Sequence, residues 1–467
     1  MMLYENNSVK DLKIAYIGGG SRGWARTLMN DLKMTEGMSG TVYLYDIDRQ
    51  AAINNGIIGN KIDGENWKYL EVETIGEALT GADFVVISIL PGTFDEMAFD
   101  VHTPEKYGIY QSVGDTAGAG GFVRALRTIP MIREIAAAVR KYCPEAWVIN
   151  YTNPMAVCVG ALYREFPEIK AFGCCHEVFG TQTLLTYALK EIEGIENVSR
   201  RDITVNVVGV NHFTWFTSAR YKNIDLFDTY HTFSDKFFET GYDPAGIEVN
   251  HWINNSFACK ERVKFDLFRR FGYIAAAGDR HLAEFMDGSE YLASKECVNS
   301  WMFGLTTADW RKEDYKARVA KTQRLLSGEE TYKLHKTGEE GTLQMRALLG
   351  LDTLVTNVNI PNRGQIPNLP VGTIVETNAA FRADSLRPVF AGEVPASIYP
   401  LIARAAKEND AILEAGFSQD LDYAFTKFAE LNMLKALSQA QKKELFQTMC
   451  RGTAKYLQCY KPGSILD

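Results

Sequence analysis

The sequence predicts an α/β fold, with a parallel sheet in the first half of the chain and an α+β domain in the second half. Through the first half, short continuous apolar runs alternate with helical patterns. Such runs are typical of parallel strands that helices cover on both faces, so they indicate successive βαβ units. Near residue 200 the pattern changes to longer alternating strands and long helical stretches. We place the boundary between 195 and 205 and expect domains at 1–200 and 201–467.

Each expected element has its own signal. In the first helix Trp24, Leu28 and Leu32 recur at intervals of four residues and define one apolar face. The segment 203–221 alternates apolar and polar residues and predicts longer strands, and amphipathic helical patterns follow it to the C-terminus. In the first domain, strands are expected at 13–18, 41–46, 83–90, 147–152 and 169–174, and helices at 21–34 and 121–142.

Composition excludes several classes of protein. Of the 467 residues 46% are apolar, which is enough for a sizeable core, and the net charge of −8 argues against an extended nucleic-acid surface. The longest apolar run, at 84–90, is too short to cross a membrane, and the polar N-terminus lacks the apolar core of a signal peptide. The eight cysteines form no CxxC pairs. We therefore expect a soluble, reduced, cytoplasmic protein without nucleic-acid or membrane partners.

A glycine-rich turn directly follows the first expected strand. In KIAYIGGGSRG, glycines 18, 20 and 23 have GxGxxG spacing between a strand and a helix, which is the context that this motif requires. Gly18 and Gly20 would let the backbone turn tightly and approach a pyrophosphate. Gly23 would permit close helix–strand packing, and Ser21 is the expected N-cap of the helix.

The second expected strand ends in a carboxylate, Asp46, within TVYLYDID. A carboxylate here accepts hydrogen bonds from the adenosine ribose and repels a 2′-phosphate, so it favours NAD over NADP. The turn and the carboxylate together predict a Rossmann-type, dinucleotide-binding first domain. The alternative is a glycine turn of structural purpose only, followed by a solvated Asp.

The segment GCCHEVFG, at 173–180, places two cysteines, a histidine and a glutamate in consecutive positions. These residue types can ligate a metal. A buried cysteine pair is more often simple packing, because a free cysteine behaves as a small hydrophobe. Spacing alone leaves both interpretations open.

A Rossmann domain most simply suggests a hydroxy-acid dehydrogenase, which needs an acid–base histidine and a clamping arginine. That hypothesis gives no role to Cys175 or to the NYTNP segment at 150–154. A dinucleotide-sensing protein without chemistry is a further alternative. The histidines available to a dehydrogenase are His102, His176, His212 and His281.

Seven motifs together resemble glycoside hydrolase family 4, in the order of that family and from about residue 12 to beyond 450. The CHEV tetrapeptide is similar to that of the α-galacturonidase branch. The resemblance implies a Rossmann domain followed by a domain like that of lactate and malate dehydrogenases. The motifs are GGGS, GDTAGAGGF (114–122), NYTNP, CHEV (175–178), GVNH (209–212), GDRHLAEF (278–285) and NIPNRGQIPNLP (359–370).

The resemblance implies hydrolysis assisted by NAD and a divalent metal, usually Mn²⁺. In the family NAD⁺ takes a hydride from C3 of the sugar, and a base then removes the acidified C2 proton. The glycosidic oxygen leaves by elimination, water adds, and the hydride returns. The net reaction is hydrolysis, and this family is an exception to the two-carboxylate mechanism of glycosidases.

The resemblance assigns roles to five residues. Cys175 and His212 are the expected metal ligands, and Cys174 is expected to pack beside the strand. Asp279 is the expected base at C2, with a structural ion pair to Arg280 as the alternative. His176 is either the acid for the leaving oxygen or a residue that orients the metal site. Asp115 is expected near the metal and cofactor, where it relays a proton or binds water.

The remaining expectations concern the cofactor and the substrate. Asn150 is expected near the nicotinamide and Asn153 near the sugar hydroxyls. Leu90 stands where the phosphosugar members carry an arginine, which argues against a 6-phosphate substrate. Arg280 is the first candidate to bind a uronate carboxylate, since a guanidinium matches it bidentately. Weaker candidates are Arg124, Arg269 and Arg270.

The substrate expected from this branch is an oligosaccharide derived from pectin that ends in an α-galacturonide. An α-glucosidase, α-galactosidase or α-glucuronidase of the same family is the alternative. The resemblance also implies a homo-oligomer, either a dimer or a tetramer.

Overall fold

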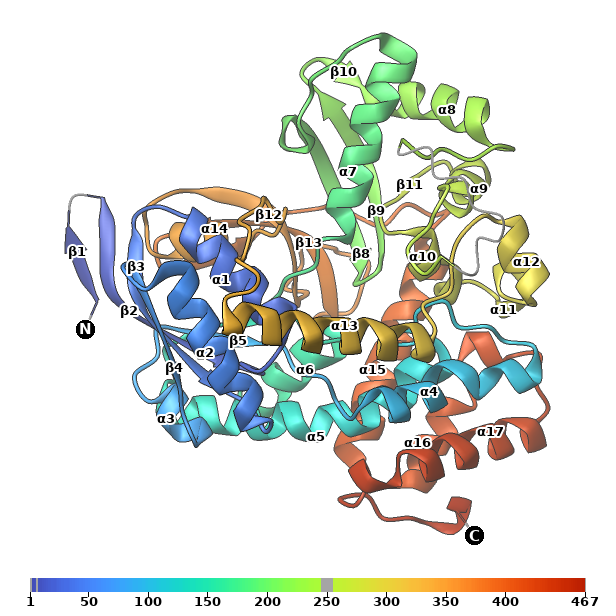
Figure 1. Cartoon of the computed structure of the whole chain (residues 1–467). Coiled ribbons are helices and arrows are strands. Elements are labelled where there is room, and N and C mark those ends of the chain that lie inside the picture. The colour runs from blue at the N-terminus through green and yellow to red at the C-terminus, as the bar shows by residue number, and fades with distance from the viewer. Residues whose placement is uncertain (1, 6, 245–254, 467) are drawn as a thin grey trace.

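A computed structural model describes residues 2–5, 7–244 and 255–466, which form two β-sheets surrounded by helices (Figure 1). Parallel strands form the centre of the larger sheet, which confirms the predicted fold class. All five strands predicted for the first half are present, as β2, β3, β5, β6 and β7. In spatial order the parallel strands are β7 (Lys170–Gly173), β6 (Trp147–Asn150), β5 (Phe84–Ile87), β2 (Ser8–Ile17), β3 (Met38–Tyr45) and β4 (Trp67–Glu71).

Strand β4 escaped the sequence analysis because it lies at the edge of the sheet. Its residues alternate between buried and exposed, and only Trp67 and Tyr69 face the interior. A strand with one solvated face carries no continuous apolar run, so the signal for a buried parallel strand is missing. At the N-terminus, β1 (Leu3–Glu5) pairs with β2 in an antiparallel hairpin.

The larger sheet extends beyond the first half of the chain. The strands β12 (Leu354–Pro361), β13 (Ile374–Arg382) and β14 (Ser385–Pro388) join it antiparallel, and β12 pairs with β7. They cover the edge of β7, whose backbone groups would otherwise lack sheet partners. A boundary near residue 200 therefore separates the two halves in sequence but does not divide this sheet.

The second sheet begins where the change of pattern predicted it. The strands β8 (Ile203–Val210) and β9 (Phe213–Tyr221) form a hairpin within 203–221, and the short strands β10 (Ile224–Asp225) and β11 (Ile274–Ala275) pair with β9. Three helices enclose an apolar cluster against this sheet (Figure 1): α7 (Glu177–Ala188), α8 (Leu226–Phe237) and α9 (Arg262–Phe271).

One apolar core reaches from the first sheet to the C-terminus, from Ala15 to Ile465. Its centre is the long helix α5 (Gly118–Tyr142), which the 121–142 pattern predicted, and the C-terminal helices pack on α5 (Figure 1). The helices of the C-terminal region are α15 (Tyr399–Ser418), α16 (Leu421–Phe428) and α17 (Gln439–Gly452).

The other α-helices connect these layers. No helix in the described ranges is long and apolar enough to cross a membrane. In chain order they are α1 (Trp24–Met34), α2 (Arg49–Asp63), α3 (Ile75–Leu79), α4 (Phe94–His102), α6 (Met155–Glu165), α10 (Asp279–Phe285), α11 (Gly288–Tyr291), α12 (Lys295–Ser300), α13 (Ala308–Ser327) and α14 (Gly341–Leu348).

Candidate active site

The glycine turn after β2 requires its first glycines for steric reasons. Gly18 has φ +95°, and a Cβ there would lie 2.1 Å from the carbonyl oxygen of Ser88. At Gly20 a Cβ would lie 2.9 Å from Oδ2 of Asp46, and the Gly20 N–H donates to that oxygen at 2.8 Å. The other oxygen of Asp46 accepts from the Asp48 N–H at 2.8 Å. The glycines thus let the turn pass close to Ser88 and to Asp46, and they place a carboxylate beside the turn, which fits a dinucleotide.

Two details of this turn differ from expectation. The N-cap of α1 is Gly23, because the helix begins at Trp24, and the Ser21 hydroxyl accepts a hydrogen bond from the Trp24 N–H at 3.1 Å. A Cβ at Gly23 would meet the guanidinium of Arg318 in α13 at 2.6 Å, not a strand. The sequence could not reveal this contact, because α13 lies far along the chain.

Two asparagines of NYTNP have different surroundings. The side chain of Asn150 is fully buried and exchanges two hydrogen bonds with the backbone of Thr152, so it closes its own turn. Its amide is therefore already engaged locally, which does not favour the expected contact with a nicotinamide. Oδ1 of Asn153, by contrast, is buried and has no partner among the described residues. Asn153 thus retains an acceptor that a ligand hydroxyl could satisfy.

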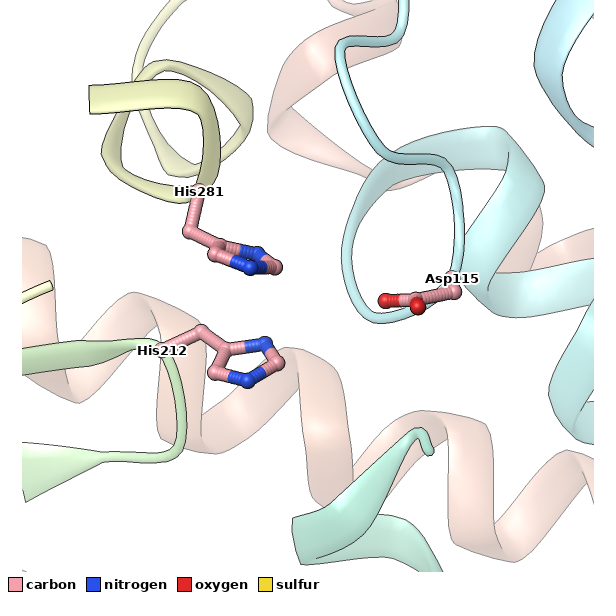
Figure 2. A group of neighbouring side chains, drawn as sticks. All are labelled: Asp115, His212 and His281. Atoms are coloured by element: carbon pink, nitrogen blue, oxygen red, sulfur yellow. The ribbon is translucent and has the colours of Figure 1, made fainter. Parts of the chain in front are cut away.

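Three side chains from distant segments meet in a compact cluster (Figure 2). Asp115 precedes α5, His212 lies in the turn between β8 and β9, and His281 lies in α10. One potential ligand atom from each lies within 4.8 Å of the others, and the centroids of the two imidazole rings are 3.9 Å apart. Nδ1 of His281 is buried without a hydrogen-bond partner in the described structure. The group thus offers an open nitrogen to a ligand.

The electrostatics of this cluster suit a cation. Burial lowers the pKa of His212 to about 3, and the adjacent His281 acts in the same direction. Burial also lowers the pKa of His281. Burial alone would raise the pKa of Asp115, but the charges of Arg124 and Arg311 outweigh it and hold this pKa well below its usual range. Two neutral imidazoles and an ionised carboxylate are the donors that divalent transition metals prefer.

Glu177 connects this cluster to the CHEV segment. It is the first residue of α7, and its Oε2 accepts a hydrogen bond from the Gly278 N–H at 2.7 Å. Its Oε1 lies 3.8 Å from Nε2 of His281 and 3.9 Å from Nε2 of His176. Burial would raise the pKa of Glu177, but the neighbouring histidines outweigh it and lower this pKa, so the carboxylate is ionised.

Cys175 is buried close to this group but is not one of its three members in the described structure. Burial raises the pKa of its thiol, as do the charges of Glu376 and Glu177, whereas a hydrogen bond with the Asn211 side chain lowers it. A bound cation would favour the thiolate. Cys174 packs in the apolar core of the larger sheet, as expected.

The carboxylate of Asp279 contacts the start of a helix. Its carboxylate accepts hydrogen bonds from the backbone N–H groups of Val263 and Lys264, both at 3.1 Å, at the start of α9. Burial, followed by the charge of Glu261, raises its pKa to about 7. The alternative, an ion pair with Arg280, is not observed, since Arg280 donates to the hydroxyl of Thr306. His281, two residues later, is the member of this motif that joins the cluster.

His176 has an acidic partner that the sequence did not suggest. Its Nδ1 lies 3.1 Å from Oε1 of Glu339, and its side chain is half-exposed. Burial would lower the pKa of His176, but the hydrogen bond and charge of Glu339 outweigh it and raise this pKa to about 9. The ring therefore carries a proton at neutral pH. Glu339 lies more than 160 positions away in the chain, so no local pattern could identify it.

The candidate arginines fall into two groups. Arg269 pairs with Asp235, and Arg270 pairs with Asp266 and Glu290, all near the surface. Arg280 and Arg124 lie near the cluster, where Arg124 donates to the Asn153 carbonyl at 3.1 Å. A third arginine, Arg311, joins them and was missed in the sequence, because WRKED in α13 resembles an ordinary solvated helix face.

The chain was compared with known proteins. An α-galacturonidase of Thermoanaerobacterium saccharolyticum is 57% identical over 98% of this chain and 99% of its own length. An α-galacturonidase of Bacillus subtilis is 48% identical over 96% and 98%. The crystal structure of a proposed glucosidase from Bacillus subtilis superposes with a TM-score of 0.90, at 49% identity, and covers 94% of this chain and all of that one.

A more distant structure shares the fold. It is a 6-phospho-α-glucosidase from gut microorganisms in complex with NAD and Mn²⁺, with a TM-score of 0.75 at 19% identity, covering 96% of this chain and 99% of that chain. The family models describe the chain directly: that of family 4 glycosyl hydrolases matches residues 13–191, and that of their C-terminal domain matches residues 186–430. With the motifs in order and both family models matched, the chain belongs to glycosyl hydrolase family 4.

Proposed function

We propose that this protein is an α-galacturonidase, which releases galacturonate from α-galacturonides such as pectin-derived oligomers. The observation that carries this proposal is its identity of 48–57%, over 96–98% of the chain, to four α-galacturonidases. The relatives that act on neutral sugars, an α-galactosidase and an α-glucosidase, are only 27% and 26% identical. Leu90 agrees with an unphosphorylated substrate, because its apolar side chain cannot pair with a phosphate.

The residues present fit the two groups that this family uses. Gly18, Gly20 and Asp46 would hold NAD, since the glycine turn follows β2 and the carboxylate lies beside it. His212 and Cys175 would hold a divalent cation, Mn²⁺ in our proposal. The other two members of the cluster, Asp115 and His281, would supply further donors. When bound, NAD supplies a hydride acceptor and donor, and the cation supplies a positive charge near the sugar oxygens.

Side chains of the protein itself would donate the proton to the leaving group and orient the substrate. His176 would protonate the leaving glycosidic oxygen, because it carries a proton at neutral pH and half of its side chain is exposed. Glu177, ionised between His176 and His281, would keep both imidazoles oriented. Asn153, with its unpartnered Oδ1, would accept a hydrogen bond from a sugar hydroxyl.

The test is hydrolysis of digalacturonate in deuterated buffer, with and without NAD⁺ and Mn²⁺, followed by NMR. We expect galacturonate to be released only when both are present, with deuterium at C2. Release without NAD⁺, or with a fully protonated C2, would contradict the proposal. Accumulation of NADH in proportion to product would instead favour a dehydrogenase.

Two further expectations belong to this proposal. We propose a reducing, cytoplasmic location, which agrees with eight cysteines that are all free thiols. We also propose a homodimer or homotetramer, which light scattering after size-exclusion chromatography would measure.

A further inference from the structure

A backbone segment beside the cluster contacts the guanidinium of Arg311 and the backbone of Arg280. The carbonyl of Val113 accepts a hydrogen bond from Nη2 of Arg311 at 3.0 Å, and the Ser112 hydroxyl donates to the carbonyl of Arg280. The N–H of Thr306 donates to the carbonyl of Ser112 at 2.8 Å. Segment 112–116, α10 and the residues around the start of α13 therefore contact one another beside Asp115.

Arg311 has one buried donor that is not used. Its Nε is buried and has no hydrogen-bond partner in the described residues. A buried guanidinium N–H without an acceptor is costly, and its absence of a partner suggests a ligand that the protein binds there. Burial lowers the pKa of Arg311 to about 10; the charge of Asp115 opposes this shift, and the charges of Arg124 and Arg280 add to it.

The carboxylates nearby offset only part of the charge of these three arginines. Of these guanidinium groups, Arg124 donates to the Asn153 carbonyl, Arg280 to the Thr306 hydroxyl and Arg311 to the Val113 carbonyl, and none of these acceptors is a carboxylate. Asp115 is a single negative charge beside them, and burial raises the pKa of Glu284 to about 7. The surroundings of Arg311 therefore have an excess of positive charge, which suits an anion with two oxygens.

We propose that Arg311 binds the C6 carboxylate of the uronide, with Arg280 as the second cation, and so selects uronides over neutral sugars. This inference rests on the proposed α-galacturonidase activity. It changes the expectation from the sequence, in which Arg280 came first. Arg269 and Arg270 are excluded, because each already pairs with a carboxylate near the surface.

The experiment compares Arg311→Met and Arg311→Lys with Arg269→Met, a matched control that also removes a guanidinium. Calorimetry with NAD and Mn²⁺ present measures the Kd of galacturonate and of galactose, and steady-state kinetics measure kcat and KM for digalacturonate. We expect Arg311→Met to weaken galacturonate binding roughly 30-fold or more, since a charge-assisted contact is lost, and to leave galactose binding unchanged. Arg311→Lys keeps the charge but lacks the planar guanidinium that donates to both carboxylate oxygens. We therefore expect it to lose less affinity for galacturonate than Arg311→Met.

Other outcomes separate the two proposals. If the wild type hydrolyses digalacturonate and Arg311→Met still binds galacturonate normally, this inference is wrong and the proposed function stands. If Arg311→Met weakens both sugars equally and lowers Tm, Arg311 has only a structural role and the inference is wrong. If the wild type neither binds galacturonate nor hydrolyses digalacturonate, both the proposed function and this inference are wrong.

Discussion

At the scale of the residue, Asp279 shows that one carboxylate can satisfy a helix terminus and still have a raised pKa. Both of its oxygens accept backbone N–H groups at the start of α9, and Cys259 and Glu261 lie within 4.8 Å. The positive charge of Lys264 acts against the negative charge of Glu261 and lowers the pKa of Asp279. Its role as the base at C2 stays a prediction, whereas its contact with α9 is directly visible.

Asp279→Asn tests the structural contact. An amide replaces one accepting oxygen with a donor, which faces a backbone N–H, so we expect the free energy of unfolding to fall by about 1–3 kcal/mol. Thermal denaturation measures this. If Asp279 is also the base, the variant releases no galacturonate with deuterium at C2. Unchanged stability would contradict the structural contact.

Glu284 gives a prediction about pH. Its Oε1 accepts the N–H groups of Val113 and Gly114, each at 2.8 Å, and burial raises its pKa from 4.5 to about 7. Because the folded state favours the protonated form, this group destabilises the fold as pH rises from 4.5 through 7, by an amount on the order of 3 kcal/mol.

Glu284→Gln keeps the accepting oxygen and cannot ionise. We therefore expect its Tm to exceed that of the wild type at pH 8, and to exceed it by much less, or not at all, at pH 4.5. Calorimetric scans of both proteins across this range test the sign. A Tm difference that does not change with pH would rule out the ionisation of Glu284 as its cause.

His281 gives a prediction about metal binding. Its buried, unpartnered Nδ1 and its position beside His212 indicate that it contributes to the same site. We expect His281→Asn to weaken Mn²⁺ binding roughly 10- to 100-fold, as outer or direct partners of a metal site do. The EPR signal of free Mn²⁺ measures this without activity, and His231→Asn, an exposed histidine in α8, is the control. Equal binding by wild type and His281→Asn would exclude His281 from the site.

At the scale of the element, helix packing depends on glycines that allow close approach. Gly416 in α15 lies against Ile129 of α5, and a Cβ there would be 2.1 Å from Cδ1 of Ile129. Gly180 in α7 is also helical, but it is exposed and no atom lies within 4 Å of its ideal Cβ. The two glycines therefore differ in packing and not in secondary structure.

Alanine at these two positions should act in opposite directions. We expect Gly416→Ala to destabilise the protein by about 1–3 kcal/mol, because the added methyl overfills the contact between α15 and α5. We expect Gly180→Ala to stabilise it by roughly 0.5–1 kcal/mol through helix propensity. Urea denaturation measures both. A stabilised Gly416→Ala variant would mean that Ile129 moves aside without cost.

At the scale of the whole molecule, the two halves share the larger sheet and the apolar core around α5. The strands β12 to β14 extend the sheet begun in the first half, and a single apolar cluster includes Ala15 and Ile465. This shared core also sets the site, since Asp115, His212 and His281 come from both halves.

We therefore expect a single cooperative unfolding transition for the full chain, with equal calorimetric and van't Hoff enthalpies. A fragment of residues 1–200 should not fold alone, because the edge of β7 and one face of α5 would be exposed. Circular dichroism and size-exclusion chromatography of the fragment test this. Two separate transitions in the full chain would contradict it.

The sequence by itself determined the parallel sheet, the glycine turn with Asp46, and the family. These depend on local patterns: continuous apolar runs, fixed glycine spacing, and short motifs in order. The sequence also identified Asp115, His176 and His212 as residues of interest, since each stands in a motif.

Only the tertiary structure decided which of these side chains meet and which partners they have. Burial and charge at one point come from segments that are distant in the chain, so Glu339 beside His176, Arg311 beside Val113 and His281 beside His212 have no local signal. Asp279 stands in a motif, but the motif did not reveal that its carboxylate accepts N–H groups at the start of α9. Motifs specify which residues are present, and long-range packing specifies what each one contacts.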